Sequence, residues 1–273
     1  MLIHIHPVDI TDEKNPDDKA FYQIILLKES VEVSVDFTPY KITAPALLFL
    51  SPYQHIDWKV IPPESATQLS FHGDFYCIEY HKQEVACNGL LFNNIYLRPY
   101  VTIDAEAFTE IENTLLKIQK EISGLSDFSE TLVKAYLQVI LALSSKEKMI
   151  QIEKHYNTLA ADNYEANEFQ KLLEAHFMTQ KSVNFYADKL HLNINSFSKK
   201  IKRQLGKSPS LLIQERVILE SKKLIHLTYL SIKEIATKLN FVDEHYFSRY
   251  FKKNVGISPS EFRTKVGISV VAK

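Results

Sequence analysis

The chain has 273 residues, 45% hydrophobic and 24% charged, so it is long enough for two globular domains and too apolar to be intrinsically disordered. Its longest apolar runs, such as residues 46–50, are too short to span a bilayer. The net charge of −1 is unevenly divided: residues 1–160 hold 13 basic and 22 acidic side chains (−9), and residues 161–273 hold 19 basic and 11 acidic ones (+8). The basic second half predicts contact with a polyanion.

The N-terminus, residues 1–14, lacks the charged stretch and apolar run of a secretory signal, so we expect a cytoplasmic protein. The sequence holds two cysteines, Cys77 and Cys87. These cannot build a disulfide framework or a four-cysteine zinc site, and we expect two buried free thiols.

Residues 21–101 show the pattern of short β-strands. Val31, Val33, Val35 and Phe37 alternate with polar residues, which is the two-residue period of a half-buried strand. Prolines break the region into strand-length pieces, at positions 39, 45, 52, 62 and 63. This spacing predicts a small β-sandwich or barrel.

After Asp104, which can cap a helix, the period changes to that of an amphipathic helix. The apolar stripe, with spacings of 3, 4, 3 and 4, consists of Phe108, Ile111, Leu115, Ile118 and Ile122. A second helix is predicted to begin at Asp127, where Glu130 completes a pattern like a capping box. The stripe can pack on the barrel of the same chain or on a second subunit, and both alternatives stay open because the repeat is too short to specify a coiled coil.

Polar residues 145–163 predict a domain boundary, and the chain from Asn163 onward looks helical. Within this part, residues 183–210 and 232–260 repeat one pattern: an apolar skeleton, a basic run, a glycine and a closing Ser-Pro-Ser. A duplicated unit of this size predicts two helix-turn-helix modules.

In the first module Ser182 can cap a helix, residues 191–193 form the turn, and Ala187 lies where the second helix crosses closely. The helical period turns Phe197 and Ile201 inward. It turns outward Asn195, Ser198, Lys199 and Lys202.

In the second module Ala236, Leu239 and Phe241 occupy the matching places, and one more residue separates Ala236 from Phe247. Asn240, which tolerates positive φ, lies at the turn. The outward residues are His245, Ser248, Arg249 and Lys252.

Polar and basic side chains on a helix suit the major groove of DNA, and the basic residues that follow suit phosphates. The predicted phosphate contacts are Lys202, Arg203, Lys207, Lys252 and Lys253. Residues 211–229, which hold no glycine or proline, predict one connecting helix. It would let a single chain read two successive turns of duplex, about 34 Å apart. The alternative, that both basic runs are merely solvated, leaves the joint recurrence of glycine and Ser-Pro unexplained.

Residues 165–265 resemble the DNA-binding domain of AraC/XylS-type transcription regulators. The second module carries the clearest motifs, in residues 235–236, 239–241, 246–253 and 256–259. The first departs from the family at Phe185-Tyr186, where Ile-Ala is usual. The resemblance implies that the residues facing bases are Asn195, Ser198, Lys199, His245, Ser248 and Arg249.

Residues 1–102 resemble the cupin-like barrel of many such regulators, through the strand pattern and residues 47–52. The expected fold is α+β and multidomain: a cupin-like barrel over residues 1–102, a helical dimerisation and linker region over 103–160, and the DNA-binding domain over 161–273. The barrel would bind an effector, and the predicted dimerisation surface is the stripe from Phe108 to Ile122. Barrel mouths commonly bind ligands, and the predicted pocket is Tyr22, Tyr40, His55, Trp58 and Tyr80.

A second hypothesis makes the barrel a metal-dependent enzyme. Its candidate ligands are His4, His6, His55, His72 and His81. His4 and His6 are the close pair, and histidines elsewhere in the strand region are more often structural. Neither a phosphate-binding glycine loop nor a nucleophile elbow is present in the sequence.

We therefore expect a transcription regulator, not an enzyme, without a cofactor or metal. Its expected partners are double-stranded DNA, RNA polymerase, a small-molecule effector and a second copy of the chain, with no membrane.

Overall fold

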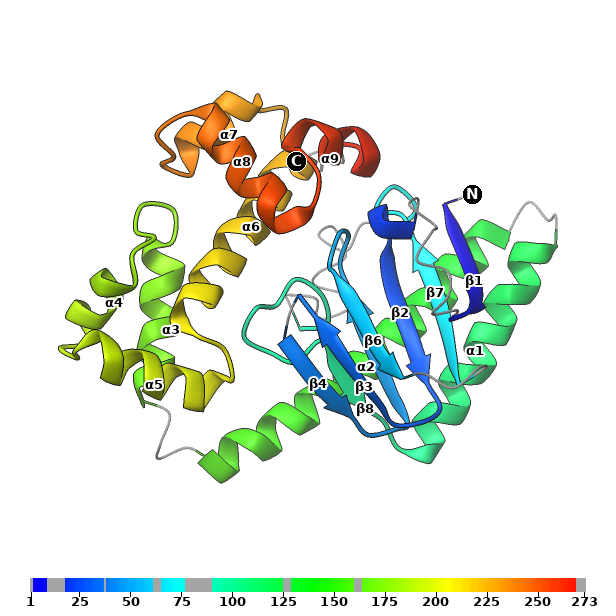
Figure 1. Ribbon diagram of the computed structural model, residues 1–273. Coiled ribbons are helices and arrows are strands. Elements are labelled where there is room, and N and C mark those ends of the chain that lie inside the picture. Colours follow the sequence, from blue (N-terminus) through cyan, green and yellow to red (C-terminus); the bar gives the residue numbers. More distant parts are fainter. Residues whose placement is uncertain are drawn as a thin grey trace. The chain divides into compact units, whose positions relative to one another are not determined.

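The computed structural model describes residues 2–8, 18–36, 38–60, 65–76, 90–124, 129–159 and 164–268. The chain divides into two compact units, Met1–Ile152 and Glu153–Lys273. Figure 1 shows the first unit as strands backed by two long helices and the second as short helices grouped around a longer one. The predicted residues Phe37, Cys77, Tyr80, His81, Cys87 and Asp127 lie outside the described residues, as do Pro62 and Pro63.

The described strands of the first unit form two antiparallel sheets. One has the order β1-β7-β2-β5-β8, from β1 (Ile3–Pro7), β7 (Ala66–Phe71), β2 (Tyr22–Leu27), β5 (Ala46–Leu50) and β8 (Tyr100–Thr102). The other has the order β4-β3-β6, from β4 (Thr38–Ile42), β3 (Val31–Val35) and β6 (Ile56–Val60). A 3₁₀ turn, Asp18–Ala20, precedes β2.

The central strands of the five-stranded sheet, β7, β2 and β5, are buried on both faces. In β5 every residue is buried, which explains why this strand is a continuous apolar run rather than an alternating one. Leu47 and Phe49 face the helices, whereas Ala46, Leu48 and Leu50 face the second sheet. The described strands thus form a sandwich of two sheets, and they do not close into the cupin-like barrel expected over residues 1–102.

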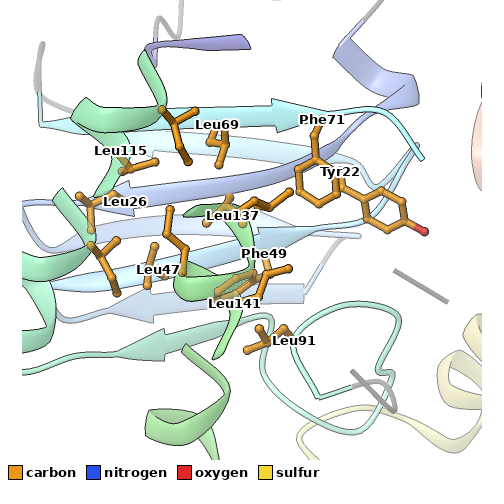
Figure 2. Packing of buried hydrophobic residues seen from close by; sticks show 14 of the residues in the cluster. Tyr22, Leu26, Leu47, Phe49, Leu69, Phe71, Leu91, Leu115, Leu137 and Leu141 are labelled. Atoms are coloured by element: carbon orange, nitrogen blue, oxygen red, sulfur yellow. The ribbon is translucent and has the colours of Figure 1, made fainter. Parts of the chain in front are cut away.

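Two helices, α1 (Ala105–Ser123) and α2 (Ser129–Leu159), cover one face of the five-stranded sheet. Figure 2 shows Leu115, Leu137 and Leu141 of these helices meeting strand residues that include Leu26, Leu47 and Phe49. The predicted cap of α1 is confirmed, because the Asp104 carboxylate accepts a hydrogen bond from the Ala107 amide at 2.9 Å.

The apolar stripe of α1 packs inside the chain. Ile111, Leu115 and Ile118 are buried in the core against the sheet, and Phe108 and Ile122 pack at its margin. Ile111, Leu115 and Ile118, enclosed in this way, cannot also contact a second subunit, so the stripe as a whole is not a dimerisation surface. Phe108 and Ile122 are only partly buried. Of the two alternatives, packing within the chain holds.

Helix α2 continues to Leu159, through the polar segment predicted as a boundary. Its polar side chains have partners in the sheet. The Lys148 ammonium donates to the carbonyls of Arg98 and Tyr100, both at 2.6 Å, and the Gln151 amide donates to the carbonyl of Thr102. Burial lowers the pKa of Lys148 to about 8. These bonds occupy carbonyl groups at and beside β8, which lies at a sheet edge, so the first part of the polar segment contacts the sheet. The division between the two units, after Ile152, falls within the same segment.

The described part of the second unit is helical. Its first three helices are α3 (Tyr164–His176), α4 (Val183–Lys189) and α5 (Ile194–Leu205). The long helix α6 (Pro209–Leu227) packs against α4 and α5 on one side and against α7, α8 and α9 on the other. These last helices are α7 (Ile232–Lys238), α8 (Glu244–Val255) and α9 (Pro259–Val266).

The repeated glycine and Ser-Pro-Ser stop one helix and start the next. Gly206 and Gly256 adopt left-handed φ angles of 74° and 92°, and their amides close the ends of α5 and α8. Ser208 and Ser258 then cap α6 and α9, with proline at the first helical position. The recurrence noted in the sequence is therefore a shared helix-capping frame.

Candidate nucleic-acid interface

Each helix-turn-helix unit is built on the same turn. The carbonyl of Ala187 accepts a hydrogen bond from the Leu192 amide, and that of Ala236 accepts one from the Phe241 amide, both at 2.9 Å. His191 and Asn240 occupy the same place in the two turns, with positive φ angles of 55° and 53°. Both alanines are buried, as expected where two helices cross closely.

The extra residue of the second unit is Val242. It lies between Phe241, whose amide closes the turn, and Asp243, the N-cap of α8. Its side chain is 91% exposed, which is unusual for a β-branched apolar residue beside a helix start. The sequence indicated the insertion by length, but not which residue it was.

The predicted recognition helix of the first unit, α5, buries Phe197 and Ile201. Asn193 caps it by accepting a hydrogen bond from the Ser196 amide at 2.8 Å. The side chains assigned to DNA lie away from the buried residues: Asn195, Lys199, Lys202 and Arg203 are exposed and Ser198 is half-buried.

Helix α8 repeats this arrangement. It buries Phe247, Phe251 and Val255, and Asp243 caps it by accepting a hydrogen bond from the Tyr246 amide at 2.6 Å. The side chains assigned to DNA again lie on the outer face: His245, Arg249, Lys252 and Lys253 are exposed and Ser248 is half-buried. These positions allow contact with DNA, and the individual contacts stay predictions.

The first unit differs from the predicted outline at Ser182. It occupies the N-cap position of α4, but its side chain makes no capping hydrogen bond. Tyr186 stabilises this region instead, since its hydroxyl donates to the carbonyl of Gln180 at 2.7 Å. Burial raises the pKa of Tyr186 to about 12.

Lys207 is not presented to solvent as the other basic residues are. Its side chain is 13% exposed, and its ammonium donates to both carboxylate oxygens of Glu215 at 2.8 and 3.0 Å. The ion pair ties the corner after α5 to helix α6. A contact of Lys207 with a phosphate would have to break this ion pair and would leave a partly buried carboxylate without its cation, so the other four predicted phosphate contacts are better placed.

Lys200, unlike its exposed neighbour Lys199, is held in an ion pair. It forms an ion pair with Glu165 of α3, and Gln204 donates to the second oxygen of that carboxylate at 3.1 Å. The hydrogen bond from Lys200, followed by that from Gln204, lowers the pKa of Glu165 to about 2. Lys200 thus anchors α5 to α3, while Lys199 remains exposed.

Two arginines that sequence reasoning missed hold the scaffold. The Arg216 guanidinium bonds both carboxylate oxygens of Glu174 at 2.9 and 3.0 Å and lies 3.7 Å from the centroid of the Phe177 ring. Arg263 of α9 donates to the carbonyls of Ile225 and Leu230. A basic composition therefore serves two purposes here, since some cations join helices and others face outward.

The residues predicted to line one effector pocket are not together. Tyr22 lies in the core between the five-stranded sheet and the helices, where it packs on Phe71 (Figure 2). Tyr40 and Trp58 pack against the other core, between the two sheets, and His55 is exposed. Since Tyr22 faces the opposite side of the sheet from Tyr40 and Trp58, a single pocket with this lining is wrong.

His4, His6 and His72, which were considered as metal ligands, form aromatic ring contacts. His4 stacks on His6 at 5.5 Å, and Phe21 packs on both His4 and His72. His72 also accepts a hydrogen bond from the Asp74 amide at 3.3 Å. Within the described ranges, three or more histidine, cysteine or carboxylate side chains do not gather into a group able to hold a metal ion.

The fold and outer faces of the second unit define a helix-turn-helix protein. The sequence profile of a family described as "Helix-turn-helix domain" matches residues 186–265. The resemblance of this part of the chain to AraC-type DNA-binding domains is confirmed.

The named relatives are transcriptional regulators. An uncharacterized HTH-type transcriptional regulator, YfiF of Bacillus subtilis, is 30% identical over 64% of this chain and 49% of its own length. The HTH-type transcriptional activator RhaS of Escherichia fergusonii is 24% identical over 65% of this chain and 59% of its own. The alignments thus span about half to three-fifths of these curated relatives. A crystal structure of ToxT from Vibrio cholerae covers 90% of both chains at 15% identity, with a TM-score of 0.42.

Among the described helices, none combines the length and the apolar character needed to cross a membrane.

Proposed function

We propose that the protein is a sequence-specific, DNA-binding transcription regulator that reads two successive segments of the major groove with α5 and α8. The observation that carries this proposal is the duplication. Two units with the same turn, cap and C-terminal glycine each present a row of polar and basic side chains on an otherwise well-anchored helix. A solvated surface needs no such repetition, whereas two groove contacts do.

In this proposal the base-facing residues are Asn195, Ser198, Lys199, His245, Ser248 and Arg249. Arginine or lysine can bond guanine, and asparagine can bond adenine. The phosphate-facing residues are Lys202, Arg203, Lys252 and Lys253, which lie in the last turns of the two helices. Those positions also favour cations through the helix dipole, so the basic residues stabilise both the free helix and the complex.

Binding-site selection from random duplex DNA tests the proposal, followed by affinity measurements at increasing salt. We expect one selected sequence with two subsites, and a steep decline of affinity with salt because phosphate contacts release counterions. A chain that enriches no sequence, or whose affinity is flat in salt, contradicts the proposal. Changing Lys171 to Met, which removes a cation from the exposed surface of α3, is the matched control for a general loss of charge.

The N-terminal unit is proposed to be regulatory, with a cupin-like sandwich that responds to a small molecule, and the protein to act as a homodimer that engages RNA polymerase. The naming of the relatives as transcriptional regulators supports a regulatory rather than an enzymatic role. Because Ile111, Leu115 and Ile118 of the α1 stripe are buried within the chain, a dimer needs a surface that extends beyond this stripe. Metal analysis of the purified protein tests the enzymatic alternative, since stoichiometric iron, manganese or zinc would favour it.

Trp58 offers a direct probe of effector binding. It is the one tryptophan of the sequence and packs at the margin of the core between the sheets, as Tyr40 does. A ligand entering there should change the emission of Trp58, and a panel of metabolites can be screened by fluorescence and thermal shift. A ligand that raises the melting temperature without changing Trp58 emission binds elsewhere.

A further inference from the structure

The two helix-turn-helix units touch through a lysine as well as through α6. Lys181 lies in the loop between α3 and α4, two residues before α4 begins. Its ammonium donates to the carbonyl oxygen of Leu239 at 2.6 Å and lies 3.5 Å from that of Asn240. Leu239 ends α7 and Asn240 forms the turn before α8, so a side chain of the first unit binds the turn of the second.

The surroundings of the Lys181 ammonium suit a fixed cation. The ammonium lies 4.7 Å from the centroid of the Phe241 ring, on the same turn. It also donates to the carbonyl of Met178 in its own loop, at 3.0 Å. Carbonyl groups at the C-terminus of α7 carry the negative end of the helix dipole, which favours a cation there. Partial burial lowers the pKa of Lys181 from its ordinary value.

A second bond runs in the opposite direction. The side-chain amide of Asn240 donates to the carbonyl of Thr179 at 3.4 Å. The loop that accepts it is held on both sides: the amides of Thr179 and Gln180 donate to the carbonyl of His176 in α3, and the Tyr186 hydroxyl of α4 donates to Gln180. A displacement of the second turn would therefore be transmitted to the first unit.

The link complements helix α6. A single helix packed between two units sets their separation but restrains rotation about its own axis only through side-chain packing. The loop carrying Lys181 reaches the second turn beside α6, not along it (Figure 1). A contact displaced from an axis resists rotation about that axis, which a contact on the axis does not.

We propose that Lys181 is a positioning residue that sets the angle between α5 and α8, and with it the distance between the two base sequences that the chain recognises. The inference rests on the proposed function, in which both helices enter the major groove. Orientation matters there because each base pair added between two sites moves one of them by roughly 3.4 Å and turns it by roughly 35° about the duplex.

The test compares three duplexes: the sequence selected by the wild-type chain, and the same subsites one base pair closer or farther apart. The wild type should prefer the selected spacing. Changing Lys181 to Met should weaken that preference about tenfold, which corresponds to 1.4 kcal/mol. Lys181→Arg keeps a cation and hydrogen-bond donors at this position, and it should retain most of the wild-type preference for the selected spacing. Lys171→Met, which removes the same charge from α3, should leave the wild-type ratio unchanged.

If Lys181 only stabilises the fold, Lys181→Met should lower the melting temperature while the relative affinities for the three duplexes stay those of the wild type. That result overturns the proposal. If Lys181→Met does not fold, Asn240→Gly decides, because glycine accepts the φ of 53° and removes only the bond to Thr179. Asn240→Gly should weaken the preference for the selected spacing less than Lys181→Met does. If the relative affinities for the three duplexes stay unchanged, the proposal is overturned. A wild-type chain that selects no DNA refutes the proposed function itself.

Discussion

The two helix-turn-helix units share a frame but anchor the recognition helix differently. Three residues after the buried phenylalanine, α5 has Lys200, paired with Glu165 of α3, whereas α8 has Tyr250, packed on Phe241 of the turn. Burial raises the pKa of Tyr250 to about 12. The same position thus accepts an ion pair or an aromatic contact. This tolerance shows that the turn, the caps and the buried phenylalanines define the unit, and that this position is adjustable.

The outer faces differ as well. Helix α5 presents Asn195 and Lys199, while α8 presents His245 and Arg249, next to the exposed Val242 that the first unit lacks. Arginine bonds guanine through two parallel hydrogen bonds, whereas lysine acts more as a point charge. In the proposed function the second unit would therefore contribute the stronger base selection, and the first would adjust it.

The largest effects should come from the shared core. Changing either Phe197 or Phe247, both fully buried, to alanine should lower the free energy of unfolding by about 3–5 kcal/mol, because each leaves a cavity under a recognition helix. Urea unfolding measures this loss. Lys199→Ala, on the exposed face of α5, is the control and should change stability by less than about 0.5 kcal/mol. A large loss in only one unit would show that the frames are not equivalent.

The next largest effect should come from substitutions on the exposed faces of α5 and α8, which should change DNA binding. Arg249→Ala and Lys199→Ala should each weaken DNA binding by about 1–3 kcal/mol and relax base preference in a different half of the site. Quantitative binding to a library of single-base variants measures both. Lys252→Ala should instead weaken all sequences alike. If Arg249→Ala kept the wild-type preference, the assignment of α8 as a reading helix would be wrong.

The glycines test the caps. Gly206→Ala and Gly256→Ala force a side chain into left-handed backbone and should each destabilise by about 1–2 kcal/mol. A Cβ atom meets no heavy atom within 4 Å at either position, so the loss should come from the backbone alone. Gly124→Ala, at the end of α1 with φ of −95°, is the control and should lose less. Thermal unfolding measures both losses of stability. If they differ between positions 206 and 256, the helix caps of the two units are not equivalent.

The smallest effect concerns the ion pair. Glu165→Gln should lower stability by about 0.5–1 kcal/mol at pH 7, as is usual for a pair that solvent partly reaches. Because folding lowers the pKa of Glu165 from 4.5 to about 2, its contribution is present above pH 4.5 and is lost as the pH falls between these values. The stabilities of wild type and variant should therefore converge in that window. Tyr250→Phe, at the equivalent position, should show no such convergence.

Sequence patterns predicted local features well where each depends on neighbouring residues. The Asp104 cap, the turns at His191 and Asn240 and the outward face of α8 all follow from the helical period and backbone preferences. Predictions failed where the partner is distant. Tyr22 and Tyr40 are both aromatic strand residues, and which face of a sheet each joins depends on strands placed elsewhere. Lys207 looks basic and available until Glu215 on the next helix is brought beside it.

The sequence by itself determined the helix-turn-helix repeat, the charge division and the helix starts and stops that the repeat shares, because these depend on residue type and on spacing over a few turns. Tertiary structure decided which face of each helix or strand is buried and which distant residue each polar side chain contacts. It enclosed the α1 stripe, tied Lys148 to the carbonyls beside β8, and brought Lys181 to the turn at Leu239, 58 residues away. Contacts of that separation depend on how the helices pack, which local periodicity does not encode.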